Sequence, residues 1–193
     1  MPLETSTNSS EQDNKIEIRT TREGFNINGK NPTSLILSLT SLNGTPIKEL
    51  EARMRPGNFS RAGFLGDNES LIKVLADDND KVLGMGLTHQ QLADLLNKIT
   101  NAPENAYFKI NGKQFSYTVQ RWKNPQESPF KDGTGTYEDY TVVRSRPWKR
   151  ITFSGLLVEM IRLYGFYEGI ETTHRLDPED LATFLGLIPP AAA

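Results

Sequence analysis

Residues 151–187 read ITFSGLLVEMIRLYGFYEGIETTHRLDPEDLATFLGL, and they decide the fold because they predict two helices joined by an aromatic turn. We expect the first helix to start at Ser154 as its N-cap and to end at Tyr164, where Gly165 supplies a left-handed stop. Nearly every residue of this helix is apolar. A helix that is apolar on all sides is typical of a central position in the core.

The second helix of this stretch has a clearer start. Asp177 is placed as the N-cap and Pro178 at the first helical position, while Leu176 is spaced to pack onto Leu181 as a hydrophobic staple. Gly186 is expected to end the helix. Capping chemistry therefore predicts both of its ends.

The middle of the chain predicts two more helices. In LTHQQLADLLNKI, at residues 87–99, Thr88 is the expected N-cap and Gln91 completes a capping box. The preceding helix is expected to be capped by Asp67 and to end near Gly84. We interpret its acidic run DDND, at residues 77–80, as a solvated helix face, because the turn glycine and closing glutamate of a calcium loop are absent.

Other segments are rich in apolar residues or alternate apolar with polar residues, as β-strands do. Asn111 and Gly112 form the strongest hairpin signal of the chain, and residues 124–136 are expected to be a loop. Residues 47–54 fit either a short helix or a strand. The expected strands lie at residues 16–20, 34–42, 107–110, 113–122, 137–145 and 147–153.

Strands and helices thus occur in separate groups along the chain, which predicts an α+β fold with a largely antiparallel sheet and about four helices. The chain has 193 residues, and a length prior of about 150 residues per domain favours a single domain. We place this domain at residues 15–188 and expect a disordered tail at residues 1–14, which lack apolar periodicity.

Two pairs of similar segments suggest a duplicated unit of strand and helix. FNINGK at residues 25–30 resembles FKINGK at 108–113, and LTHQQLADLL at 87–96 resembles LDPEDLATFL at 176–185. The halves would span about residues 15–100 and 105–188. The alternative is that NGK turns and capped amphipathic helices are common objects.

Composition excludes several classes of function. The chain has no cysteine, which excludes disulfides, thiol nucleophiles and cysteine-based metal centres. Its two histidines lack the spacing of a metal site, so we expect neither a metal nor a cofactor. No secretory signal and no run of about 18 apolar residues is present, which predicts a cytoplasmic protein without a membrane partner.

The aromatic turn supplies two kinds of candidate site. Its carboxylate, imidazole and guanidinium are groups that a general acid–base site uses, and they come from Glu168, His174 and Arg175. The alternative is a structural loop whose aromatic side chains cover the core and whose carboxylate pairs with the guanidinium or caps a backbone group. Its aromatic side chains are candidates for contact with a protein partner, and these are Tyr164, Phe166 and Tyr167.

Residues 107–150 are a local exception to the net charge of −2, because they hold nine Lys or Arg residues against four acids. Both tryptophans lie among these cations, and aromatic rings among basic groups suit stacking on bases and pairing with phosphates. The alternative is that both tryptophans belong to the core. The nucleic-acid candidates are Arg121, Trp122, Lys123, Arg144, Arg146, Trp148, Lys149 and Arg150.

Three functions remain open from the sequence. The leading interpretation is a non-enzymatic interaction domain that binds a protein partner through a sheet face or the aromatic turn. The first alternative is a nucleic-acid-binding protein that uses residues 121–150. The second alternative is a small hydrolase-like enzyme with its site in the turn at residues 164–175.

Overall fold

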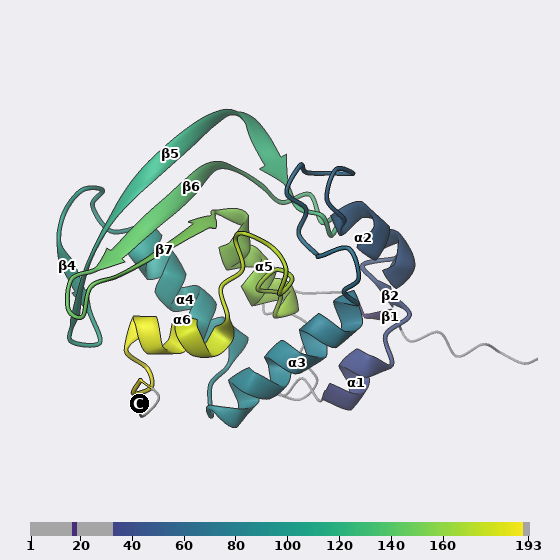
Figure 1. The fold of residues 1–193 in the computed structure, drawn as a ribbon, viewed down its shortest axis with the longest axis horizontal. Coiled ribbons are helices and arrows are strands. Elements are labelled where there is room, and N and C mark those ends of the chain that lie inside the picture. The colour runs from purple at the N-terminus through teal and green to yellow at the C-terminus, as the bar shows by residue number, and fades with distance from the viewer. Residues whose placement is uncertain (1–16, 19–32, 191–193) are drawn as a thin grey trace, which may run out of the picture.

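The computed structural model describes the backbone of residues 17–18 and the whole of residues 33–190. Figure 1 shows a sheet of long strands that arches over a layer of helices. This mixed arrangement in a single compact body confirms the predicted α+β class. The expected tail at residues 1–14 and the FNINGK segment of the proposed duplication, at residues 25–30, lie outside the described residues.

The main sheet is an antiparallel meander with the strand order β4-β5-β6-β7. Its strands are β4 Phe108–Ile110, β5 Lys113–Glu127, β6 Gly135–Arg144 and β7 Lys149–Ser154. The hairpin predicted at Asn111 and Gly112 joins β4 to β5, and both turn residues have positive φ. Because β4 and β7 end the order, each has one edge without a neighbouring strand of this sheet.

A smaller sheet lies near the N-terminal end of the described chain. It consists of β1 Glu17–Ile18, β2 Ser41–Leu42 and β3 Thr45–Pro46, in which β1 runs parallel to β2 and β2 antiparallel to β3. Asn43 and Gly44 form the turn between β2 and β3 with φ of 51° and 76°. Glycine has no Cβ to clash at such positive φ values, and asparagine tolerates them better than most residues.

Helices form the second layer, with α4 alongside α5 under the sheet (Figure 1). The sheet turns Phe115 and Val142 towards them, and the ring of Phe115 meets that of Phe184 in α6 with 5.4 Å between centroids. The helices of the described residues are α1 Thr33–Leu37, α2 Ile47–Met54, α3 Leu71–Gly84, α4 His89–Thr100, α5 Leu156–Tyr164 and α6 Pro178–Leu185.

The strongest capping signals are confirmed. Thr88 and Gln91 form the expected capping box of α4, and Asp177 accepts backbone N–H bonds at the start of α6. Gly165 and Gly186 adopt the left-handed conformation that ends α5 and α6. These signals are local, since cap and capped groups lie within five residues of each other.

Several element boundaries were predicted wrongly. Residues 34–42 are not one strand, because they divide between α1 and β2. The expected loop at 124–136 is shorter, because β5 continues to Glu127 beyond a register shift. Ser70 rather than Asp67 caps α3, and Ser154 is the last residue of β7, so that Gly155 precedes α5. The two short helices α1 and α2 raise the helix number above the expected four.

The acidic run at residues 77–80 is not a solvated face throughout. Asp77 and Asp80 are exposed, but the side chains of Asp78 and Asn79 are buried. Both follow the helical spacing of Leu71, Val74 and Leu75, which places them on the inward stripe of α3. This part of the solvated-face prediction was therefore wrong.

Candidate functional site

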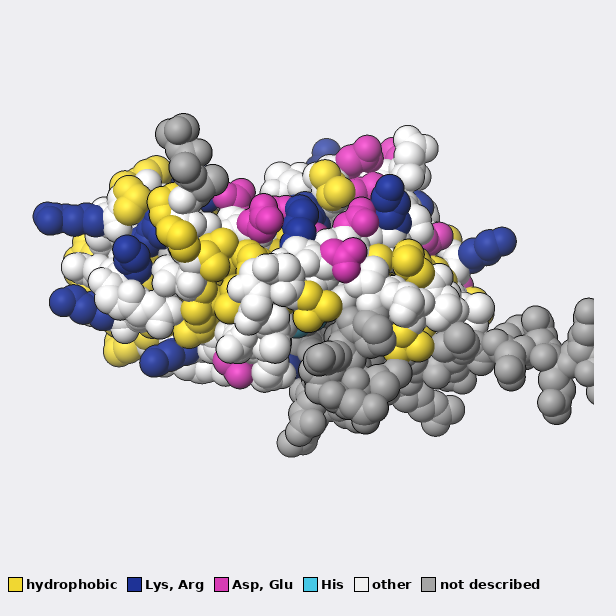
Figure 2. Space-filling view, turned by 90° about the horizontal axis from the view of Figure 1, so that it is seen from below, with side chains coloured by type: hydrophobic (Ala, Val, Ile, Leu, Met, Phe, Trp, Pro, Cys, Tyr) yellow, Lys and Arg dark blue, Asp and Glu magenta, His cyan; other side chains and the backbone are white. Residues whose placement is uncertain are grey.

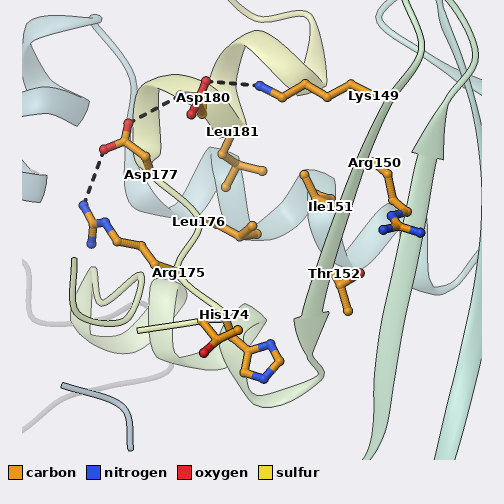
Figure 3. A pocket seen from close by; sticks show the side chains of 11 residues that line it. Lys149, Arg150, Ile151, Thr152, His174, Arg175, Leu176, Asp177, Asp180 and Leu181 are labelled. Carbon is orange, nitrogen blue, oxygen red and sulfur yellow. Dashed lines mark hydrogen bonds and ion pairs between the residues drawn. The ribbon is translucent and has the colours of Figure 1, made fainter. Parts of the chain in front are cut away.

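A hollow of about 360 Å³ lies between the edge strand β7 and the start of α6. Figure 3 shows residues 149–152 of β7 on one side and residues 174–181 on the other. The hollow brings together residues that the sequence assigned to two different candidate sites. Lys149 and Arg150 come from the basic segment, while His174 and Arg175 come from the aromatic turn.

The floor of the hollow is apolar. Ile151 points from β7 towards Leu176 and Leu181, which come from the loop before α6 and from α6 itself (Figure 3). Leu181 is 1% exposed and belongs to the hydrophobic core. Ile151 is partly buried and packs against this core. An apolar floor with a few polar groups at its rim is the usual composition of a binding pocket.

Capping of α6 holds the far wall in place. The Asp177 side chain accepts the backbone N–H of Glu179 at 3.0 Å, and Pro178 occupies the first helical position. The backbone N–H of Leu176 donates to the carbonyl of Tyr167 at 3.3 Å, which ties this wall to the aromatic turn. The wall is therefore a supported element rather than a free loop.

The backbone of β7 is free on the side of the hollow. The Gly155 N–H donates to the Glu138 carbonyl at 2.8 Å, so Gly155 and Glu138 form a hydrogen-bonded pair in register with the β6–β7 ladder. In an antiparallel ladder, hydrogen-bonded pairs recur at every second residue of a strand. The residues that bond to β6 are therefore 149, 151 and 153, while the backbone groups of Arg150 and Thr152 point away from β6. Within residues 33–190, no backbone group bonds to these outward groups.

Ion pairs neutralise most charges around the hollow. Lys149 pairs with Asp180 at 3.1 Å, and Lys81 pairs with Asp177 at 2.5 Å. Arg150 is exposed and forms no ion pair with any residue of the described part of the chain. Its side chain leaves β7 on the side opposite Ile151 (Figure 3).

Arg175 forms a second, buried group of charges behind the wall. Its guanidinium lies 2.5 Å from Asp78 and 3.5 Å from Asp177. Burial raises the pKa of Asp78, while the hydrogen bond from Arg175 lowers it. Since the Asp78 side chain is 1% exposed and that of Arg175 is 9% exposed, we assign this pair a structural role.

The two other candidate catalytic groups are not brought together. Glu168 is buried, and its carboxylate accepts a hydrogen bond from the Thr172 hydroxyl at 3.1 Å. Burial raises its pKa to about 7. His174 is exposed at the hollow, and neither a hydrogen bond nor an ion pair joins it to Glu168 in the described structure. Arg175 does reach this turn, because it donates to the backbone carbonyl of Glu168 at 2.6 Å.

The three aromatic side chains proposed for partner contact are buried. Tyr164, Phe166 and Tyr167 are each at most 1% exposed. The Tyr164 ring stacks on Phe130 with 3.8 Å between centroids, and its hydroxyl donates to Asp132. They offer no surface in this conformation, because their large apolar rings complete the core.

The basic segment does not form one surface. Arg144 is buried and donates to the carbonyls of Thr183 and Phe184, while Arg121 pairs with Glu104 and Glu138. Both tryptophans are exposed rather than in the core, Trp122 at 49% and Trp148 at 69%. Lys123, Arg146 and Arg150 are also exposed.

The exposed tryptophans lie at opposite ends of the sheet. Arg121, which precedes Trp122 in β5, pairs with Glu138 near the start of β6. Arg144, which lies four residues before Trp148, is at the other end of β6 and pairs with Phe115. Residues 138 and 144 are six positions apart on β6, which is about 20 Å at the rise of a strand. Figure 2 shows acidic and hydrophobic side chains interspersed among the Lys and Arg side chains of the face seen from below.

Sequence reasoning missed a buried polar cluster between α3, α4 and the aromatic turn. The two ring nitrogens of His89 lie 2.9 Å from the Tyr167 hydroxyl and 3.1 Å from the Asn79 side-chain oxygen. Burial lowers the pKa of His89 to about 4. The helical spacing of α3 was the available signal, because it places Asn79 on the inward stripe.

The described residues contain neither a cluster of metal ligands nor a membrane-spanning helix. No group of three or more His, Cys, Asp or Glu side chains there could hold a metal ion. None of the described helices has both the length and the apolar content that crossing a membrane requires.

Comparisons with protein-family models, with curated proteins and with solved structures gave no significant match to this chain.

Proposed function

We propose that this chain is a protein-binding domain and that it holds an extended segment of its partner along the free edge of β7. One observation carries the proposal: the hollow lies beside a strand edge whose outward backbone groups, at Arg150 and Thr152, bond to no described backbone group. An edge of this kind can bind an extended peptide through main-chain hydrogen bonds.

The walls of the hollow favour a peptide over a compact ligand. A strand added to β7 would turn alternate side chains towards Ile151 and Leu176, where the floor is apolar. Main-chain bonds would then supply affinity, and the side chains in the hollow would supply selectivity. The buried aromatic turn supports this arrangement from behind, since Leu176 is bonded to Tyr167.

The exposed Arg150 also bears on how the edge is used. A positive charge on an edge strand discourages pairing between identical copies, because two such edges repel each other. The same charge does not oppose a partner segment that lacks positive charge. The edge of β7 is therefore better suited to a different chain than to a second copy of this one.

Substitution of Thr152 tests the proposal. Proline at this position removes the outward N–H without removing a bond of the β6–β7 ladder, whereas Thr152→Val keeps the N–H and the branched side chain. Peptides selected from a displayed library on the wild-type protein should bind Thr152→Val equally well. Thr152→Pro should bind them at least about tenfold more weakly, because main-chain bonds are lost.

Hydrogen exchange provides the independent readout. The amides of Arg150 and Thr152 should exchange rapidly in the free protein and become protected when a selected peptide is bound, because they then donate to its carbonyls. Equal affinity for Thr152→Pro, together with unprotected amides in the complex, would place the peptide elsewhere and overturn the proposal.

Salt dependence separates this function from the nucleic-acid alternative. Binding through main-chain bonds and apolar side chains should weaken little between 50 mM and 200 mM salt, while binding through several phosphate contacts weakens steeply. The observation that favours the alternative is the exposure of Trp148 between Arg146 and Arg150. The proposal predicts that single-stranded DNA does not compete with a selected peptide.

A further inference from the structure

We infer that the segment held by β7 has alternating acidic and apolar side chains, with a carboxylate opposite Arg150. This inference rests on the proposed function, since it specifies the partner of the same edge. It follows from the difference between the two faces that an added strand would meet. One face is that of the Ile151 side chain, where the apolar floor of the hollow lies, and the other is the outer sheet face, onto which the Arg150 side chain leaves β7 (Figure 3).

The face towards the hollow selects apolar side chains. Partner residues on the side of Ile151 would contact Leu176 and Leu181. The charges at the rim of this face are already paired, because Asp180 binds Lys149 and Asp177 binds Lys81. A charged partner side chain would lose hydration in the hollow without gaining an unpaired counter-ion.

The outer face selects a carboxylate next to Arg150. The cross-strand neighbour of Arg150 on β6 is Val143, so the adjacent strand provides no counter-ion. The next outer residue of β7, Thr152, lies with its hydroxyl 3.2 Å from that of Thr141 and carries no charge. Within the described part of the chain Arg150 is therefore an unpaired cation, and a side chain of an added strand can lie directly opposite it.

The periodicity of a strand joins these two requirements. Successive side chains point to opposite faces, so the partner residue beside Arg150 and the residue beside Ile151 are consecutive. An acidic residue followed by an apolar residue satisfies both positions. A basic residue beside Arg150 would instead place two like charges opposite each other, which is destabilising.

Three blocked eight-residue peptides test the inference, in which valine alternates with glutamate, with threonine or with lysine. Fluorescence anisotropy would measure their affinities for the wild-type protein and for Arg150→Glu. One opposite-charge pair across strands should change affinity about two- to fivefold. We expect the wild type to prefer glutamate over threonine and threonine over lysine, and Arg150→Glu to reverse this order.

Arg146→Glu is the matched control, because Arg146 is an exposed cation at the same end of the sheet but lies outside β7. It has the same net charge as Arg150→Glu, so an effect of overall charge would appear equally in both variants. We expect the order of the peptides to stay as in the wild type for Arg146→Glu. Equal reversal in the two variants would overturn the assignment to Arg150.

The remaining outcomes separate the inference from the proposed function. If all three peptides bind the wild type with equal affinity and all are lost in Thr152→Pro, the edge binds peptides and the acidic preference is wrong. If none of them binds and the library also yields no peptide dependent on Thr152, both statements fail. If single-stranded DNA competes with the glutamate peptide, Arg150 serves a phosphate rather than a carboxylate.

Discussion

Asp77 and Asp78 are consecutive aspartates with opposite environments. The side chain of Asp77 is exposed, whereas that of Asp78 is 1% exposed and bonds to Arg175 through both carboxylate oxygens. Neighbouring residues on a helix point about 100° apart, so one residue can face solvent while the next faces the core. The stability effects of their substitution should therefore differ greatly, although the sequence assigned both residues to a solvated helix face.

Asp78→Ala should lower the free energy of unfolding by about 3–5 kcal/mol, because it leaves the Arg175 guanidinium buried without its main counter-ion. Asp77→Ala is the matched control and should change it by less than about 0.5 kcal/mol. Urea unfolding followed by circular dichroism measures both. Similar small losses in the two variants would show that the pair with Arg175 does not form in solution.

Glu168 predicts a dependence of stability on pH. Burial raises the pKa of Glu168 from 4.5 to about 7, so the folded state holds a proton that the unfolded state releases. Its stabilising contribution is complete below pH 4.5 and is lost as the pH rises through 7. The loss should be about 3 kcal/mol, which is the free-energy equivalent of this shift in pKa.

The variant Glu168→Gln isolates this contribution, since glutamine does not titrate. Its free energy of unfolding, relative to wild type, should increase between pH 4.5 and 8. His89 has the opposite sign, because its lowered pKa of about 4 gives stability that is lost as the pH falls below 6.5. Both proteins retain His89, so its contribution cancels in the difference. If the difference in unfolding free energy between the two proteins did not change with pH, the pKa of Glu168 would not be raised in the folded state.

At the scale of elements, the packing of α4 and α5 under the sheet follows from their apolar stripes. Leu92 of α4 is fully buried and Met160 of α5 is 1% exposed, while Leu83 of α3 is 44% exposed. The helical periodicity of α4 and the uniform apolar content of α5 predicted these positions, because helices bury the stripe that is apolar.

Leu92→Ala and Met160→Ala should each lower the free energy of unfolding by about 2–5 kcal/mol, since each leaves a cavity in the core. Leu83→Ala is the control and should cost less than about 1 kcal/mol, because an exposed leucine has little buried area to lose. Midpoints of urea unfolding give the comparison. A loss for Leu83→Ala as large as for Leu92→Ala would contradict the assignment of the α3 and α4 faces.

At the scale of the whole molecule, the distribution of charge bears on whether the partner is a protein or a nucleic acid. Ion pairs or burial engage Arg121, Arg144 and Lys149, and the exposed candidates are divided between the two ends of the sheet. A continuous basic surface is what allows several phosphates to be contacted at once. The exposed arginines that share one end are Arg146 and Arg150.

The slope of binding against salt tests this view of the surface. With two phosphate contacts, the affinity for a single-stranded oligonucleotide should change with a logarithmic slope of about −1.4 or shallower. The double variant Arg146→Ala with Arg150→Ala should remove most of that slope, and Lys123→Ala, at the other end, should leave it unchanged. A slope of about −4 or steeper in the wild type would favour the nucleic-acid alternative.

The sequence by itself determined those features that depend on residues close together in the chain. The caps at Thr88 and Asp177, the stop at Gly165 and the hairpin at Asn111 are all present, because each depends on hydrogen bonds or backbone angles within a few residues. The grouping of these elements was sufficient to predict the α+β class.

Only the tertiary structure decided which groups are exposed and which lie side by side. The buried pair of Asp78 with Arg175 joins residues that are 97 positions apart, and the hollow joins residues 149–152 to residues 173–181. No local pattern specifies such distances. For the same reason the aromatic side chains of the turn proved to be core and the edge of β7 became the candidate site, because burial and free strand edges result from the packing of the whole chain.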